Sequence, residues 1–216
     1  MNKKHIVCYG DSNTWGYDGK TGGRLDDDSR WTRLLQEKLG PDCLVMEEGL
    51  NGRTTVFEDP LEEGLNGLTS LVPVLRSHAP VDLMILMLGT NDCKARFSAT
   101  PHDITQGLRR LVLKARGMEV WREAPRLIII APMVMGEGLY KVPEVAASMG
   151  PGCVEKSREL PGLMLRLSQE LGCAFLDSNV SVVPNTTDFM HIAQECSEAL
   201  ARKVAEASLK LLARTN

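Results

Sequence analysis

A serine that could act as a nucleophile stands near the start of the chain. Ser12 follows a short apolar run over residues 5–9 and closes the sequence Gly10-Asp11-Ser12. In an open parallel sheet the chemistry gathers just beyond the carboxyl ends of the strands. A hydroxyl there becomes a nucleophile if a base and an oxyanion site converge on it. Taken alone, a serine in this position is more often a turn or helix-capping residue, so its partners decide the interpretation.

One histidine has a carboxylate close to it in the sequence. His191 lies three residues after Asp188, behind a loop segment at 184–187 that is rich in Pro, Asn and Thr. A short loop can bring a carboxylate to one ring nitrogen and leave the other facing the nucleophile. The alternative is that Asp188 caps a helix and the histidine is incidental. The remaining histidines lie at the start of a strand, near a helix end and at a helix start: His5, His78 and His102.

Two further turns could supply donors for an oxyanion. Asn91, in Gly89-Thr90-Asn91-Asp92, carries a side-chain amide directly after an apolar run. Gly52 follows another apolar run, in a turn where glycine lets the backbone approach a ligand closely. Each turn is ordinary by itself. What favours a site is that all these residues follow predicted strands.

The elements that must position these residues alternate along the chain. Segments with apolar residues at helical spacing separate five short apolar runs. Such alternation implies right-handed crossovers and predicts an α/β fold, a three-layer α/β/α sandwich around a flavodoxin-like five-stranded parallel sheet. We expect one domain over residues 1–216. The predicted strands are 5–9, 43–48, 83–88, 127–131 and 173–177.

Several local signals refine this picture. Pro101 followed by Asp103 is typical of a helix start, with the acid near the positive end of the helix dipole. Pro161 lies inside a run of helical period, so we expect a kink or a late helix start there. Residues 13–29 and 132–153 are long and irregular. Each is a surface excursion, a pocket wall or, for 132–153, a cover for a neighbouring subunit in a homo-oligomer.

Composition excludes several classes of function. The 216 residues are 43% hydrophobic and 25% charged. The net charge of -3 does not favour binding to nucleic acid or to an anionic membrane. No run approaches the ~20 apolar residues of a membrane span. The first apolar run is too short for a secretory signal, and six cysteines form no C-x-x-C motif. We therefore expect a cytoplasmic protein without structural zinc.

Four sequence blocks together resemble the SGNH, or GDSL-type, hydrolases. Gly10-Asp11-Ser12 matches the first block, and Gly89 to Asp92 matches the Gly-x-Asn-Asp block. Asp188 to His191 matches the Asp-x-x-His block. The glycine block fits Gly52 best, with Gly49 as the fallback. The matches extend over nearly the whole chain.

The resemblance implies a role for each matched residue. Ser12 would be the nucleophile, and His191, oriented by Asp188, the general base and then the general acid. The Ser12 and Gly52 N–H groups and the Asn91 side chain would form the oxyanion hole. This implies a covalent acyl-enzyme that water or another alcohol resolves. The resemblance implies no metal or organic cofactor.

Further stretches are similar to the arylesterase-type members, which cleave small esters and in some cases transfer acyl groups. The stretches are 12–16, 30–31, 47–50 and 87–92. We expect a small-molecule ester substrate. A carbohydrate O-deacetylase of the same family is the alternative, because both activities use the same residues. Outside the enzymes, a non-catalytic flavodoxin-like binding module and an inactive interaction protein are further alternatives.

Residues close to Ser12 in sequence are candidates for lining the pocket. We assign Asn13, which replaces the usual leucine, and Trp15 to substrate binding. Tyr17 and Trp31 are weaker candidates, since Trp31 also fits the apolar stripe of a helix. Asp11 is expected to hold the turn around Ser12 without a catalytic role.

Overall fold

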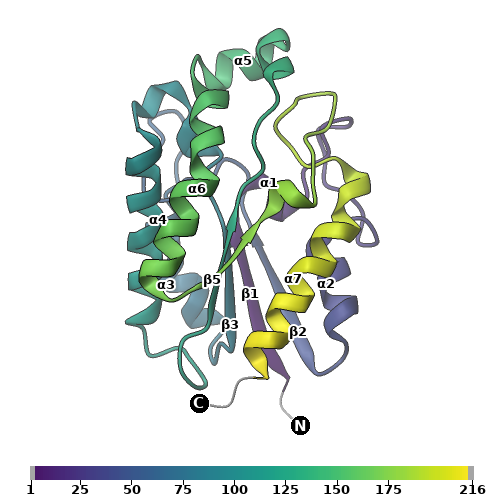
Figure 1. Cartoon of the computed structure of the whole chain (residues 1–216), viewed down its shortest axis with the longest axis vertical. Coiled ribbons are helices and arrows are strands. Elements are labelled where there is room, and N and C mark those ends of the chain that lie inside the picture. Colours follow the sequence, from purple (N-terminus) through teal and green to yellow (C-terminus); the bar gives the residue numbers. More distant parts are fainter. Residues whose placement is uncertain (1–2, 214–216) are drawn as a thin grey trace.

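The computed structural model describes residues 3–213 and contains a parallel sheet of five strands (Figure 1). The strand order is β2-β1-β3-β4-β5, and every pairing is parallel. The predicted sheet is therefore confirmed, and no strand end differs from its predicted position by more than one residue. The strands are β1 (Lys4–Gly10), β2 (Cys43–Gly49), β3 (Leu83–Met87), β4 (Leu127–Ala131) and β5 (Ala174–Asp177).

Helices cover both faces of this sheet, as the three-layer prediction requires. In Figure 1, α3, α4 and α6 lie to the left of the sheet and α2 and α7 to the right. The side chains of β1 alternate accordingly, with Tyr9 in the core on one face and Cys8 in the core on the other. The helices are α1 (Ser12–Trp15), α2 (Trp31–Leu39), α3 (Gly67–Ser77), α4 (Pro101–Arg116), α5 (Pro143–Met149), α6 (Cys153–Leu171) and α7 (Ser197–Leu212).

Two helix starts test the sequence signals. At α4 the expected start is confirmed, because Thr100 and Asp103 form a reciprocal capping box in front of the first turn. The late start at Pro161 is wrong, since α6 begins at Cys153 and runs through the proline. Apolar residues on both sides of Pro161, such as Val154 and Met164, are fully buried. Their burial outweighs the roughly 3 kcal/mol that an interior proline costs.

The two irregular segments contain more local structure than the sequence indicates. Residues 132–153 include a 3-10 turn over Glu137–Lys141 and all of α5. Residues 13–29 begin with most of α1 and continue into a small two-stranded turn closed by a bridge between Tyr17 and Arg24. Both segments follow carboxyl ends of strands, so they lie at the end of the sheet where Ser12 stands.

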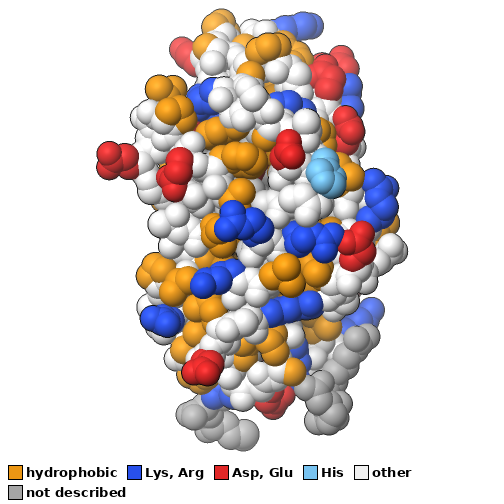
Figure 2. All heavy atoms as spheres, turned by 90° about the vertical axis from the view of Figure 1, so that its left-hand side faces the viewer, with side chains coloured by type: hydrophobic (Ala, Val, Ile, Leu, Met, Phe, Trp, Pro, Cys, Tyr) orange, Lys and Arg blue, Asp and Glu red, His pale blue; other side chains and the backbone are white. Residues whose placement is uncertain are grey.

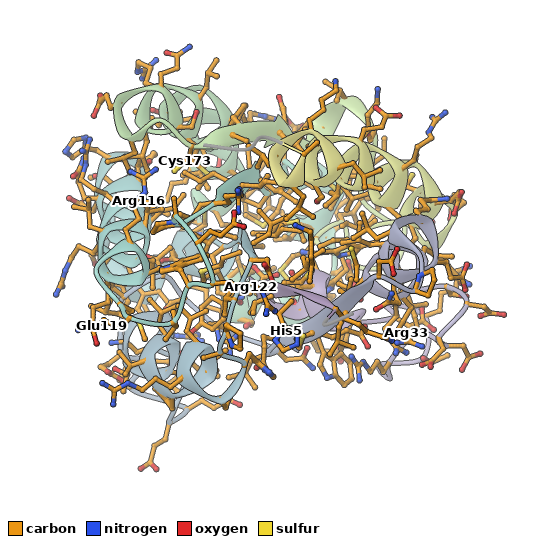
Figure 3. The ribbon with its side chains drawn as sticks, turned by 90° about the horizontal axis from the view of Figure 1, so that it is seen from below. His5, Arg33, Arg116, Glu119, Arg122 and Cys173 are labelled. Carbon is orange, nitrogen blue, oxygen red and sulfur yellow. The ribbon has the colours of Figure 1, made fainter. Side chains whose placement is uncertain are left out.

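The amino ends of the strands form the opposite end of the molecule, seen in Figure 3. Asp82, which is buried just before β3, accepts hydrogen bonds from the backbone N–H of His5 at 2.7 Å and from the Arg122 side chain. His5 and Arg122 lie close together in this view. Through Asp82, these contacts tie β1 to the segment that leads into β4.

Candidate active site

The turn after β1 holds Ser12 in a single orientation. Asp11 caps α1, its side chain accepting a hydrogen bond from the Asn13 N–H at 2.9 Å, as expected for a residue that holds this turn. Gly16, with φ of 89°, ends the helix and donates its N–H to the Ser12 carbonyl at 2.9 Å. At Gly10 a Cβ atom would lie 2.0 Å from the Thr14 hydroxyl. Only glycine therefore allows the chain to turn so tightly below Ser12.

Three of the predicted residues, 179 positions apart at the extremes, meet in one line of hydrogen bonds. His191 Nε2 lies 2.8 Å from Ser12 Oγ, and His191 Nδ1 lies 2.9 Å from Asp188 Oδ2. All three side chains are buried, with 5–6% of each residue exposed. A ring nitrogen in this position can accept the serine proton while the carboxylate stabilises the imidazolium that forms.

The Asp188 carboxylate is held ionised by its surroundings. Burial raises its pKa, but the hydrogen bonds and charge of His191, together with the Met190 N–H, outweigh burial and lower the pKa to about 2. Asn185 adds a further hydrogen bond from Nδ2 to Asp188 Oδ1 at 2.9 Å. The Asn185 N–H also donates to the His191 carbonyl at 2.8 Å, so this residue clamps both ends of the turn. Sequence reasoning missed Asn185; its position three residues before an aspartate in a polar loop is the only available signal.

The predicted oxyanion donors lie on two neighbouring loops. Asn91 Nδ2 donates one hydrogen to the Arg53 carbonyl at 3.2 Å, and an amide nitrogen carries a second hydrogen. Gly52 has φ of 83°, a left-handed conformation that favours glycine. Within residues 3–213, the backbone N–H groups of Ser12 and Gly52 donate to no backbone carbonyl. They are thus available to a bound oxygen.

Gly49, the fallback for the glycine block, has a different role in the structure. It ends β2 and pairs with Gly10 in the sheet. A Cβ atom there would lie 2.1 Å from the Trp15 backbone nitrogen. Gly49 is therefore a close-packing position against α1, which leaves Gly52 as the better candidate donor.

Two buried charged side chains, Arg53 and Asp92, hold these loops in place, and nothing in the sequence indicated this role. The Arg53 guanidinium lies 4.1 Å above the Tyr9 ring and donates to the Gly10 carbonyl at 2.8 Å. Asp92 accepts a hydrogen bond from the Thr55 N–H at 2.9 Å. Burial is the main cause that raises the pKa of Asp92 to about 6. These contacts tie the Gly52 and Asn91 loops to the nucleophile turn.

The two residues assigned to substrate binding differ in the structure. Asn13 is buried, its Oδ1 accepts a hydrogen bond from the Ile192 N–H at 2.9 Å, and its carbonyl accepts one from Trp31 Nε1 at 2.8 Å. Its side chain is therefore engaged in holding the segment after His191 and is not turned to open space. Trp15 is half-buried with the Arg24 guanidinium over its ring, and its contact with substrate stays a prediction.

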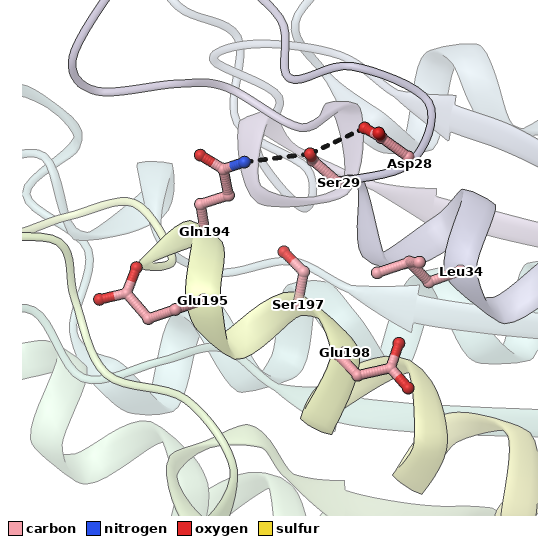
Figure 4. A pocket seen from close by; sticks show the side chains of 7 residues that line it. All are labelled: Asp28, Ser29, Leu34, Gln194, Glu195, Ser197 and Glu198. Atoms are coloured by element: carbon pink, nitrogen blue, oxygen red, sulfur yellow. Dashed lines mark hydrogen bonds between the residues drawn. The ribbon is translucent and has the colours of Figure 1, made fainter.

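Two other cavities lie outside this arrangement. One, of about 420 Å³, lies between the loop before α2 and the start of α7, where Gln194 donates to Ser29 and Ser29 to Asp28 (Figure 4). The other, of about 370 Å³, lies between α3 and α4 beside Arg76 and Lys114. Figure 2 faces these helices and shows Lys and Arg side chains gathered across the middle. None of the predicted site residues lines either cavity.

Comparison with known proteins gives the family. The model of the GDSL-like lipase/acylhydrolase family matches residues 8–201, which include all four sequence blocks. The chain belongs to this family. The resemblance seen in the sequence is thereby confirmed. A comparison with curated proteins found no match.

Solved structures of this family share the whole architecture. A carbohydrate acetylesterase family member from Sinorhizobium meliloti is 36% identical, with a TM-score of 0.91 over 98% of this chain and 100% of that one. The native aryl esterase of M. smegmatis is 34% identical, with a TM-score of 0.87 over 96% and 99%. A putative arylesterase from Agrobacterium tumefaciens is 31% identical, with a TM-score of 0.85 over 96% and 99%.

Among residues 3–213, no helix is long and apolar enough to cross a membrane.

Proposed function

We propose that this GDSL-family hydrolase is a serine esterase that cleaves small carboxylic esters through an acyl-enzyme. The observation that carries the proposal is the line of hydrogen bonds from Ser12 Oγ through His191 to Asp188, at 2.8 and 2.9 Å. Ser12 follows the carboxyl end of β1 beside β3, where the strand order reverses, and this is where an α/β sheet binds its ligands.

Acylation begins when Ser12 Oγ attacks the ester carbonyl carbon and its proton passes to His191 Nε2. The Asp188 carboxylate, whose pKa of about 2 keeps it ionised, stabilises the imidazolium. The negative carbonyl oxygen accepts hydrogen bonds from the Ser12 and Gly52 N–H groups and the Asn91 amide. The bond to the alcohol oxygen then breaks, and His191 returns its proton to that oxygen, which leaves as the alcohol.

Deacylation repeats these steps with water. His191 takes a proton from the water as its oxygen attacks the acyl carbon, and a second oxyanion forms at the same donors. Collapse of this intermediate breaks the bond to Ser12 Oγ, which recovers a proton from His191, and releases the carboxylic acid. If another alcohol enters in place of water, the product is a new ester, so acyl transfer uses the same residues.

The substrate class is a short-acyl or aryl ester. The solved relatives named as aryl esterases support this choice. The carbohydrate acetylesterase family member at 36% identity supports the second candidate, removal of acetyl groups from sugars. Both candidates share a small acyl group and differ in the alcohol.

Initial rates test the proposal most simply. Wild type should hydrolyse p-nitrophenyl acetate faster than p-nitrophenyl octanoate, and Ser12→Ala should lose both activities by at least about a thousandfold. Phenyl acetate beside a peracetylated monosaccharide then separates the two alcohol classes. If neither nitrophenyl ester shows turnover that depends on Ser12, the esterase proposal fails and a non-catalytic member of the fold takes its place.

A further inference from the structure

The loop over residues 16–25, here called the covering loop, packs directly on the Asp188–His191 pair. The Tyr17 ring lies over the imidazole of His191, with centroids 4.2 Å apart and planes tilted by 34°. The covering loop follows α1, near the start of the chain, whereas the pair lies on the loop after β5. The contact therefore depends on the tertiary fold alone.

A second contact closes over the carboxylate. A Cβ atom added to Gly19 would lie 2.4 Å from Asp188 Oδ2 and 2.8 Å from Asn185 Nδ2. The Gly19 backbone thus lies against the same oxygen that accepts the hydrogen bond from His191 Nδ1. The Asp188 and His191 side chains beneath these two residues are only 9% and 7% exposed.

The covering loop is built to keep this position. Its two arms are joined by hydrogen bonds from Asp18 N–H to the Gly23 carbonyl at 3.0 Å and from Leu25 N–H to the Gly16 carbonyl at 2.8 Å. The Asp18 carboxylate closes the tip by accepting hydrogen bonds from the Lys20 N–H at 2.9 Å and the Thr21 hydroxyl at 2.7 Å. At the base, the Tyr17 N–H donates to the carbonyl of Ser12 at 3.0 Å. The covering loop is therefore anchored to the serine whose base it covers.

We propose that Tyr17 and Gly19 are positioning residues that hold and desolvate the Asp188–His191 pair during the reaction. Because the Gly19 backbone lies against Asp188 Oδ2, it takes space from water that would compete with His191 Nδ1 for that oxygen. The aromatic face of Tyr17 supports the imidazolium that forms when Ser12 gives up its proton, because the face of a π system attracts a cation. This inference rests on the proposed function for its kinetic consequence, but the covering contact itself does not.

Two glycines of the same loop provide a matched test. Gly19→Ala puts a methyl group against Asp188, so either the carboxylate or the loop must move. Gly23→Ala meets only the Thr21 hydroxyl, at an ordinary 3.4 Å, and neither glycine has a left-handed φ. We expect Gly19→Ala to lower kcat on p-nitrophenyl acetate by about 10- to 100-fold, with KM within about twofold, since small misplacements of catalytic groups have effects of this size. Gly23→Ala should keep wild-type kcat.

A spectroscopic signal reads the pair independently of turnover. The far-downfield proton resonance of His191 Nδ1–H, assigned by its loss in Asp188→Asn, should shift or broaden in Gly19→Ala and stay in place in Gly23→Ala. This measurement stands even if the wild type has no esterase activity, which would refute the proposed function alone. If the resonance and kcat are the same in both glycine variants, the covering role is wrong.

Two variants of Tyr17 test whether the stacking of its ring on His191 matters. Tyr17→Leu removes the aromatic face and should lower kcat by about tenfold. Tyr17→Phe keeps the ring and should restore most of that loss. Equal kcat values for the Leu and Phe variants would overturn the role of the ring. Should Gly19→Ala fail to fold, the Tyr17 pair with the same resonance decides between these outcomes.

Discussion

Replacing Asp92 by asparagine should change how the stability of this protein depends on pH. Asp92, the residue after Asn91 in the same turn, is fully buried. Burial raises its pKa from 3.8 to about 6; the hydrogen bonds from Thr55 oppose the shift, and the negative charge of Asp11 adds to it. One oxygen, Oδ2, has no hydrogen-bond partner among the residues that the structure describes. Ionised Asp92 is therefore a net cost to the folded state.

The pH dependence of stability follows from the difference in proton binding between the folded and unfolded states. A carboxyl whose pKa is raised on folding binds its proton more tightly in the folded state, so stability falls as pH rises from about 4 to about 6 and then levels off. A pKa raised from 3.8 to about 6 corresponds to roughly 3 kcal/mol at neutral pH, most of which develops above pH 4. Asp92→Asn keeps an oxygen that can accept the hydrogen bond from the Thr55 N–H and removes the ionisation.

Urea unfolding at several pH values between 4 and 7 measures this effect. The free energy of unfolding of Asp92→Asn minus that of wild type should rise by about 2–3 kcal/mol across this range. Asp42→Asn, which removes an exposed carboxyl, is the control for a general change of charge. A difference between Asp92→Asn and wild type that stays constant with pH would refute the argument that Asp92 is a strained buried acid.

Other variants test the remaining parts of the site. Asn91→Ala should lower kcat on p-nitrophenyl acetate by about 100- to 1000-fold with a folded circular dichroism spectrum, because one oxyanion donor is lost; full activity would remove Asn91 from the oxyanion site. His191→Ala and Ser12→Ala should be about equally damaging, and their double variant no worse, because such residues act as a unit; additive losses in a kinetic cycle would contradict this. Asn13→Ala should destabilise by about 1 kcal/mol in thermal or urea unfolding and lower kcat, since the Ile192 N–H loses its acceptor. Asn13→Asp keeps that acceptor and should be milder; the opposite order would show that Asn13 acts by another contact.

The sheet was predictable because its strands have an unambiguous sequence pattern. The run at 83–88 is apolar throughout, as expected of a central strand covered on both faces, and β3 is fully buried. Since all parallel strands end at one edge, the residues that follow them had to converge there. For this reason the sequence alone predicts that Ser12, Asn91 and His191 lie close together.

Other features depend on contacts that leave no local signal. α3 begins at a glycine and contains Pro73 in its interior, and both residues disfavour a helix. The helix forms nevertheless, because burial of Leu71 and Leu75 in the core stabilises it. Asn13 looked available to a substrate because nothing in its neighbourhood identifies Ile192 as its partner. The approach of Gly19 to Asp188 is equally invisible, since glycine in a polar loop is typical of any turn.

Covalent trapping tests the central claim, that Ser12 is the nucleophile activated by His191, most directly. Diethyl p-nitrophenyl phosphate should react once per chain, as Ser12 Oγ bonds to phosphorus and p-nitrophenolate leaves. Mass spectrometry of peptides should place the diethylphosphoryl group on Ser12 in wild type. The group should be absent in Ser12→Ala and attach far more slowly in His191→Ala. Modification of another residue, or ester hydrolysis that continues after stoichiometric labelling of Ser12, would contradict the account.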